Sequence, residues 1–254
     1  MSRSLWISAA AVLIAGMVEA AQPVVLSREQ GEREGRQLAE EMRSMRPEKP
    51  SASSGVLTIK RGSNPATTVP IRFDIKPYKR NWITTYEAAG VQKGISRLTV
   101  THQDGGTNAY VVVENGAEKR LAGSETMVSF AGSDFWVADL GLEFLAWPGQ
   151  RILRKEIRRG QSCSVLESTN PNPEPGTYVR VLSWVDIDTG GIVNADAFGN
   201  ERRPIKEFAA KSFKKIEGRW ELKEIEMYDR RSNSRTTLTF DLRAGKTPPE
   251  TGSR

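Results

Sequence analysis

The residue types that most often carry catalysis are scarce in this chain. His102 is the only histidine and Cys163 the only cysteine, which excludes a metal site with two histidines and an internal disulfide. The acidic residue nearest to His102 is Asp104, which opens a Gly-Gly turn, so we expect a surface histidine at the end of a strand. Cys163 lies in a run typical of a strand, and we expect a buried apolar residue rather than a link to another chain.

Patterns of nucleophilic and phosphate chemistry are also missing. The chain has no Gly-x-Ser-x-Gly elbow, no Ser-x-x-Lys in a catalytic setting and no glycine-rich loop that opens a helix. Asp186 and Asp188 flank Thr189-Gly190-Gly191, which is typical of a polar turn. We therefore predict that the protein is not an enzyme and has no catalytic residue, no metal and no cofactor. A carboxylate pair that cleaves envelope polymers is the enzymatic alternative.

Tryptophan is the more informative residue type. Of the six tryptophans, Trp6 lies near the N-terminus, and the others fall in predicted strands or in an apolar stretch at residues 133–149. Each one alone is best explained as a core residue. Together they indicate an apolar face whose cover leaves a hollow for acyl chains. We predict that this hydrophobic cavity and its lid are formed by Phe73, Trp82, Phe135, Trp136, Leu140, Leu142, Phe144, Leu145, Trp147, Trp184, Trp220 and Met227.

The N-terminus has the features of a secretory signal peptide. Arg3 precedes an apolar run at residues 5–18, and Val18-Glu19-Ala20 resembles a signal peptidase site. The run is shorter than the roughly 20 residues that cross a bilayer. We therefore expect residues 1–20 to be removed and the mature chain to be exported as a soluble periplasmic protein.

Residues 21–54 are predicted to form one helix and a linker. Apolar residues follow a helical spacing up to Met45, and Ser27 is placed as an N-cap. Pro47 and the serine-rich residues 51–55 then end the helix.

From residue 55 the pattern changes to the alternation of strands with one buried face. Val69, Ile71 and Phe73 alternate with Pro70 and Arg72, and no connection is long enough for a parallel crossover. Residues 55–242 are therefore predicted to be mainly β, with a large curved antiparallel sheet, or half-barrel, and a disordered tail at residues 243–254. The predicted strands cover residues 69–76, 82–87, 95–101, 107–114, 117–121, 151–159, 162–168, 177–187, 192–198, 205–216, 219–228 and 235–242.

The apolar stretch at residues 133–149 is predicted to form one or two short helices that cover the concave face of the sheet. Ser133-Asp134 resembles a helix start, and Gly141 and Pro148 interrupt the helical pattern. The segment is too short and too interrupted to be a stable helix alone, so its apolar residues must pack on the sheet.

The formal net charge is +6, and the densest basic stretch is residues 151–159. A solvated strand face has the same composition, and an exported protein seldom meets nucleic acid. Attraction to anionic lipid headgroups is the more sensible use of this charge. We predict no nucleic-acid partner and at most a peripheral contact with membranes.

Five segments carry a further pattern: Gly132-Ser133-Asp134-Phe135, and residues 82–87, 160–168, 180–186 and 214–227. Together they resemble the outer-membrane lipoprotein-sorting family, which includes the LolA-like periplasmic carriers. The resemblance covers most of the mature chain and is best at residues 132–242. The proline-rich residues 170–176 and the basic residues 151–159 fall outside it.

The resemblance implies a half-barrel wrapped around helices, with a hollow that shields the acyl chains of lipoproteins or lipids. It therefore implies a carrier, with outer-membrane lipoprotein sorting as its expected use. The same fold also serves periplasmic sensors, so the alternative is a lipid-sensing adaptor that regulates an inner- or outer-membrane protein partner. Fold analogy alone does not identify the cargo.

Overall fold

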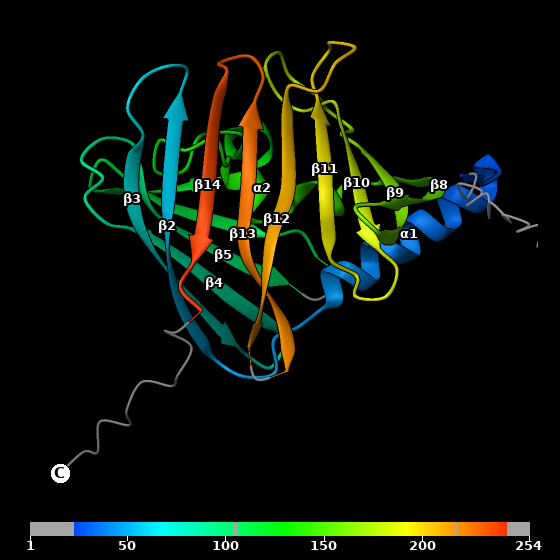
Figure 1. Ribbon diagram of the computed structural model, residues 1–254, viewed down its shortest axis with the longest axis horizontal. Helices are drawn as coiled ribbons and strands as arrows, with labels where there is room; N and C mark the ends of the chain where they lie inside the picture. Colours follow the sequence, from blue (N-terminus) through cyan, green and yellow to red (C-terminus); the bar gives the residue numbers. More distant parts are fainter. Residues whose placement is uncertain (1–22, 104–105, 217, 243–254) are drawn as a thin grey trace, which may run out of the picture.

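The computed structural model describes residues 23–103, 106–216 and 218–242 (Figure 1). The predicted signal peptide at residues 1–20 and the predicted tail at residues 243–254 lie outside the described residues. None of the helices in the described part of the chain is both long and apolar enough to cross a membrane.

The strands form one 14-stranded sheet in the order β1-β8-β9-β10-β11-β12-β13-β14-β2-β3-β4-β5-β6-β7. Every pair in this order is antiparallel. Within the described ranges the edge strands β1 and β7 do not pair with each other, so the sheet is open. The structure thus confirms the predicted mainly β half-barrel. The strands are β1 (Val24–Val25), β2 (Ser51–Arg61), β3 (Thr67–Pro77), β4 (Asn81–Ala88), β5 (Ile95–Gln103), β6 (Ala109–Glu114), β7 (Ala117–Leu121), β8 (Gly149–Arg158), β9 (Gln161–Thr169), β10 (Arg180–Asp186), β11 (Ile192–Phe198), β12 (Lys206–Ile216), β13 (Arg219–Asp229) and β14 (Ser234–Phe240).

The predicted alternation sets which side chains reach the core. On β3, Val69, Ile71 and Phe73 are buried, whereas Pro70 and Arg72 are exposed. Successive side chains of a strand point to opposite faces, so each strand supplies one apolar row to the concave side. These rows form one core cluster under β2 to β7 and a second under α1 and β8 to β11.

The structure differs from the predicted linker at residues 51–55. Strand β2 begins at Ser51, and residues 51–55 pair with residues 71–75 of β3. Hydrogen bonds to a neighbouring strand outweigh the weak strand preference of serine and alanine. The half-barrel therefore begins a few residues earlier than the sequence predicts.

Helix α1 (Arg28–Ser44) lies along β8 beside one end of the sheet (Figure 1). As predicted, Ser27 is its N-cap, and the Ser27 Oγ accepts a hydrogen bond from the Gln30 N–H at 3.3 Å. The helix approaches the strand closely because it has glycine at the contact. A Cβ on Gly35 would lie 2.6 Å from the backbone N and Cα of Arg151.

The concave face is covered by residues 133–147, which we call the covering segment (Figure 1). It contains the short helices α2 (Val137–Leu140) and η2 (Glu143–Ala146), in agreement with the one or two short helices predicted, and η1 (Gly123–Thr126) precedes it. The predicted helix start at Ser133-Asp134 is wrong, because α2 begins after Trp136. The Asp139 carboxylate supports that start by accepting a hydrogen bond from the Trp136 N–H at 2.7 Å.

Asp134 instead attaches the covering segment to β14. Its Oδ2 accepts hydrogen bonds from Ser234 Oγ at 3.0 Å and from Thr236 Oγ1 at 2.7 Å. The backbone N–H of Asp134 donates to Thr236 Oγ1 at 2.9 Å. All three residues are buried, so each polar group depends on these protein partners rather than on water.

Replacing Gly35 with alanine should lower the free energy of unfolding by about 1–3 kcal/mol, because the new methyl group overpacks a backbone contact. At an open helical position the same change would raise stability by roughly 1 kcal/mol. Chemical denaturation measures the difference, with Glu40→Ala on the exposed side of α1 as the matched control. A stability gain in Gly35→Ala would contradict the close approach of α1 and β8.

Replacing Thr236 with valine should cost about 1–3 kcal/mol, since it deprives the buried Asp134 amide and carboxylate of a partner. Thr237 is the matched control, because it lies half-buried on the opposite face of the same strand. Thr237→Val should stay within about 0.5 kcal/mol of the parent protein. Equal losses in denaturation experiments on the two variants would show that Asp134 is not an anchor.

Candidate functional site

An apolar cavity of about 620 Å³ lies between the sheet and the covering segment. It separates the two core clusters, since Phe73, Met227 and Leu238 belong to the first, and Leu145 and Ala195 to the second. Small side chains at Ala195 and on neighbouring strands leave space that the covering segment does not fill. The size falls within the range typical of pockets for small ligands.

The structure brings eight of the twelve predicted site residues to this cavity. Its lining includes Phe73, Trp82, Phe135, Leu140, Leu142, Phe144, Leu145 and Met227. Their placement agrees with the predicted hydrophobic hollow, whereas binding by these residues stays a prediction.

The other four predicted residues do not line the cavity. Trp147 is buried in the second core cluster, and Trp136 stacks on Tyr178 with ring centroids 4.5 Å apart. Trp184 points to the opposite face of the sheet, where it packs with Cys163. Trp220 is 70% exposed, so its predicted position in the cavity is corrected.

Cys163 is a free, buried residue, as predicted. His102 differs from the prediction, because it is half-buried at the cavity wall rather than on the surface. Its ring stacks on Trp82 at 4.7 Å, and its Nε2 lies 3.3 Å from Thr84 Oγ1. Burial lowers the pKa of His102 to about 4, so the imidazole is neutral near pH 7.

Lys206 is a buried cation at the cavity wall that sequence reasoning did not single out. Its Nζ donates to the Asp134 carbonyl at 2.6 Å, lies 3.9 Å from the Asp139 carboxylate and sits 3.7 Å from the centroid of the Trp136 ring. Burial lowers the pKa of Lys206 to about 8 and raises that of Asp139. Because a carbonyl, a carboxylate and an aromatic ring already contact the amine, this cluster fixes the covering segment rather than presenting a nucleophile.

Tyrosines fix the other side of the covering segment. Tyr110 Oη donates to Glu143 Oε2 at 2.7 Å, and Tyr86 Oη donates to the Leu140 carbonyl at 3.1 Å. Burial raises the pKa of Glu143 and raises the pKa of Tyr86 to about 12. Asn108 Nδ2 donates to the Gly141 carbonyl at 2.7 Å. The covering segment is therefore hydrogen-bonded to strands on both sides of the cavity.

Arg43 lies at the end of the cavity where α1 ends. The sequence patterns do not identify Arg43 as a site residue. Its Nη1 donates to the Gly106 carbonyl at 3.3 Å. Its buried Nε has no hydrogen-bond partner among the described residues. Met45 is 53% exposed beside it and also lines the cavity. Met45, Gln103 and Gly191 are exposed residues of the lining at this end, so we call it the mouth of the cavity. Arg43 is the cation there.

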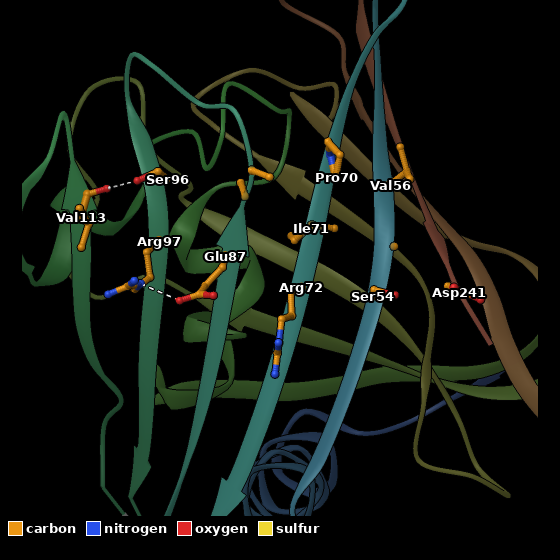
Figure 2. Close-up of a pocket in the computed structure, with 13 residues that line it drawn as sticks. Ser54, Val56, Pro70, Ile71, Arg72, Glu87, Ser96, Arg97, Val113 and Asp241 are labelled. Atoms are coloured by element: carbon orange, nitrogen blue, oxygen red, sulfur yellow. Dashed lines mark hydrogen bonds and ion pairs between the residues drawn. The ribbon is translucent and has the colours of Figure 1, made fainter. Parts of the chain in front are cut away.

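A second hollow lies on the outer face of the sheet, over β2 to β6 (Figure 2). Its arginines already have partners: Arg97 pairs with Glu87 at 2.9 Å, and Arg72 pairs with Asp74 at 2.8 Å. Surface pairs of this kind contribute little energy and leave no free cation. In the described part of the chain, no group of three metal-binding side chains is placed to hold an ion. The interior cavity is therefore the candidate site.

Comparisons with known proteins agree with this architecture. A family model described as an uncharacterized protein matches residues 79–248, which is more than half of the chain. None of the curated proteins compared matches this chain. Among solved structures, a DUF1329 family protein from Desulfovibrio piger is 22% identical, with a TM-score of 0.65 over 84% of this chain and 92% of that chain.

Two further structures share the fold. A putative outer membrane lipoprotein-sorting protein domain from Vibrio parahaemolyticus is 17% identical, with a TM-score of 0.68 over 88% of this chain and 95% of that chain. A LolA superfamily protein from Nitrosomonas europaea is 17% identical, with a TM-score of 0.55 over 88% of this chain and 98% of that chain. This chain thus has the LolA-type fold and belongs to the family of uncharacterized proteins whose model it matches.

Proposed function

We propose that this protein is a non-catalytic periplasmic carrier that takes an acyl chain of a lipid or lipoprotein into the interior cavity. The observation that carries the proposal is the apolar space of about 620 Å³ between two core clusters. Burial of each methylene group contributes roughly 0.8 kcal/mol, so a partly buried chain binds without any reacting group. The described lining presents no arrangement of an activated nucleophile and a base.

Similarity to a lipoprotein-sorting domain and a LolA superfamily protein supports this choice of ligand and compartment. The apolar lining would bind the acyl chain in a carrier or in a lipid-sensing adaptor alike. We choose the carrier because no described surface feature favours a specific protein regulator.

Access through the mouth suits the structure better than displacement of the cover. The covering segment is held by Asp134, Tyr86 and Tyr110. At the mouth, by contrast, the end of the Met45 side chain lies against Gly190. Methionine is unbranched and flexible, so this contact can open with little change to the sheet.

The Arg43 guanidinium in the cavity lining favours an acidic amphiphile as the ligand. A guanidinium stays protonated and donates hydrogen bonds in a fixed geometry that suits carboxylate and phosphate. An acyl chain in the cavity would place such a headgroup at the mouth, next to Arg43. The ligand class is therefore a fatty acid or an anionic lipid.

Replacing Ala195 with phenylalanine should fill part of the cavity and weaken binding of a fluorescent fatty acid. Loss of about two methylene contacts corresponds to roughly a tenfold weaker affinity. Fluorescence titration measures the change. Ala209→Phe is the control, because Ala209 lies half-buried on β12 and does not line the cavity. Failure of the parent protein to bind the fatty acid, or equal affinity in Ala195→Phe, would refute binding in this cavity.

Replacing Arg43 with methionine should weaken binding of the fatty acid by about tenfold, because a hydrogen bond to a charged group contributes roughly 1.5–3 kcal/mol. The methyl ester of the same acyl chain has no carboxylate and should bind equally well to both proteins. Arg36→Met, on the exposed side of α1, is the matched control. An equal loss for acid and ester would assign Arg43 a packing role instead.

A further inference from the structure

The end of the β12–β13 hairpin projects beyond the neighbouring strands. Pairing of β12 with β11 ends at Ala209, and pairing of β13 with β14 begins at Glu224. Residues 211–216 and 218–223 therefore form a two-stranded extension at the lower end of the sheet (Figure 1). We call it the projecting hairpin. An isolated pair of strands is marginally stable in water, so an extension of this kind gains from a surface to rest on.

Two large aromatic side chains are exposed on this hairpin. Trp220 is 70% exposed and Phe213 is 51% exposed, whereas Trp82 is 7% exposed. Lys215 lies opposite Trp220 and Phe213 lies opposite Leu222 in the strand register, which places them on one face. Leu222 lines the cavity. The exposed aromatic residues therefore continue the concave face just past the cavity.

The hairpin is also basic. Lys211, Lys214, Lys215 and Lys223 are all exposed, and Lys211 pairs with Glu226 at 3.4 Å. In the described part of the chain no ion pair is formed by the other three lysines. Lys215 shares the face of Phe213 and Trp220, whereas Lys214 lies opposite Glu221 on the other face of the hairpin. Exposed aromatic rings flanked by lysines are suited to a surface with an apolar interior and negative headgroups.

Two occupants fit this exposed surface, a second copy of the chain and a lipid bilayer, and charge complementarity distinguishes them. A second copy of the chain would bring like-charged lysines together, which is unfavourable. An anionic bilayer offers opposite charge to the lysines and an interface in which tryptophan is enriched. We propose that the projecting hairpin docks on the surface of an anionic phospholipid bilayer, with Trp220 and Phe213 at the headgroup level.

Docking in this way places the mouth of the cavity near the bilayer. The residues after α1 and the lower ends of β12 and β13 lie at the same end of the sheet (Figure 1). The contact itself requires no ligand in the cavity, so it does not depend on the proposed carrier function.

Co-sedimentation of the full chain with lipid vesicles tests the proposal. The protein should bind vesicles of phosphatidylethanolamine and phosphatidylglycerol, and should bind phosphatidylcholine vesicles much more weakly. Phe213→Ser with Trp220→Ser should reduce the binding constant by about tenfold, as should Lys214→Glu with Lys215→Glu. Added salt should weaken binding by the parent protein.

Two matched controls remove an apolar side chain or a charge elsewhere. Ile157 is 61% exposed on β8, and Lys93 is exposed in the turn after β4. Ile157→Ser and Lys93→Glu should bind vesicles like the parent protein. All variants should bind the fluorescent fatty acid normally, because none of these residues lines the cavity. An unchanged thermal unfolding transition shows that each variant is folded, independently of fatty-acid binding.

The proposal is overturned if the parent protein does not bind anionic vesicles, or if both hairpin variants bind them as well as the controls do. Dimerisation that is lost in the Phe213→Ser and Trp220→Ser protein, without vesicle binding, would assign the surface to a second copy. Vesicle binding without any fatty-acid binding would refute the carrier function and leave the docking surface intact.

Discussion

A curved sheet that does not close has one apolar face that its own strands cannot bury. Here the concave rows of a 14-stranded sheet are covered by one helix and the covering segment, residues 133–147. The cover must reach from β4 and β6 on one side to β12 and β14 on the other, because it bonds to Tyr86, Tyr110, Lys206 and Thr236. A segment with two short helices spans that width but does not fill it. The cavity follows from this mismatch between the area to be covered and the volume of the cover.

The polar contacts of the cover explain why the space does not close by collapse. A segment this short has little helical stability of its own. Buried hydrogen bonds at both of its sides therefore determine the distance between the covering segment and the sheet. Lys206 and Asp139 are costly to bury separately, so their cluster with Trp136 holds one arrangement. Movement of the cover toward the sheet would break several of these contacts at once. The hollow is thus maintained by a few polar groups in its wall, while most of its lining is apolar.

Much of the fold follows from patterns that the sequence displays directly. Alternation on β3 and the Ser27 cap predict the strands and the first helix correctly, because both depend on near neighbours. The errors concern partners far along the chain. Lys206 bonds to Asp134 and Arg43 bonds to Gly106, at separations of 72 and 63 residues, which no local pattern reveals. Residue type alone places Trp184 and Trp220 in the cavity. The face of each is instead set by strand register, which is irregular after Trp184 and after Ala210.

The placement of charge along the cavity gives the proposed ligand a single favourable orientation. Arg43 lies at the mouth with a buried nitrogen that lacks a partner in the described chain. Lys206 is the first residue of β12 and lies away from the projecting hairpin. Its amine is already contacted by Asp134, Asp139 and Trp136. An anionic headgroup therefore meets an available positive charge at the mouth, whereas deeper in the cavity it would lose water beside an amine that already has partners. The acyl chain must then extend inward beneath the cover, and the headgroup must face the end of the sheet from which Trp220 projects.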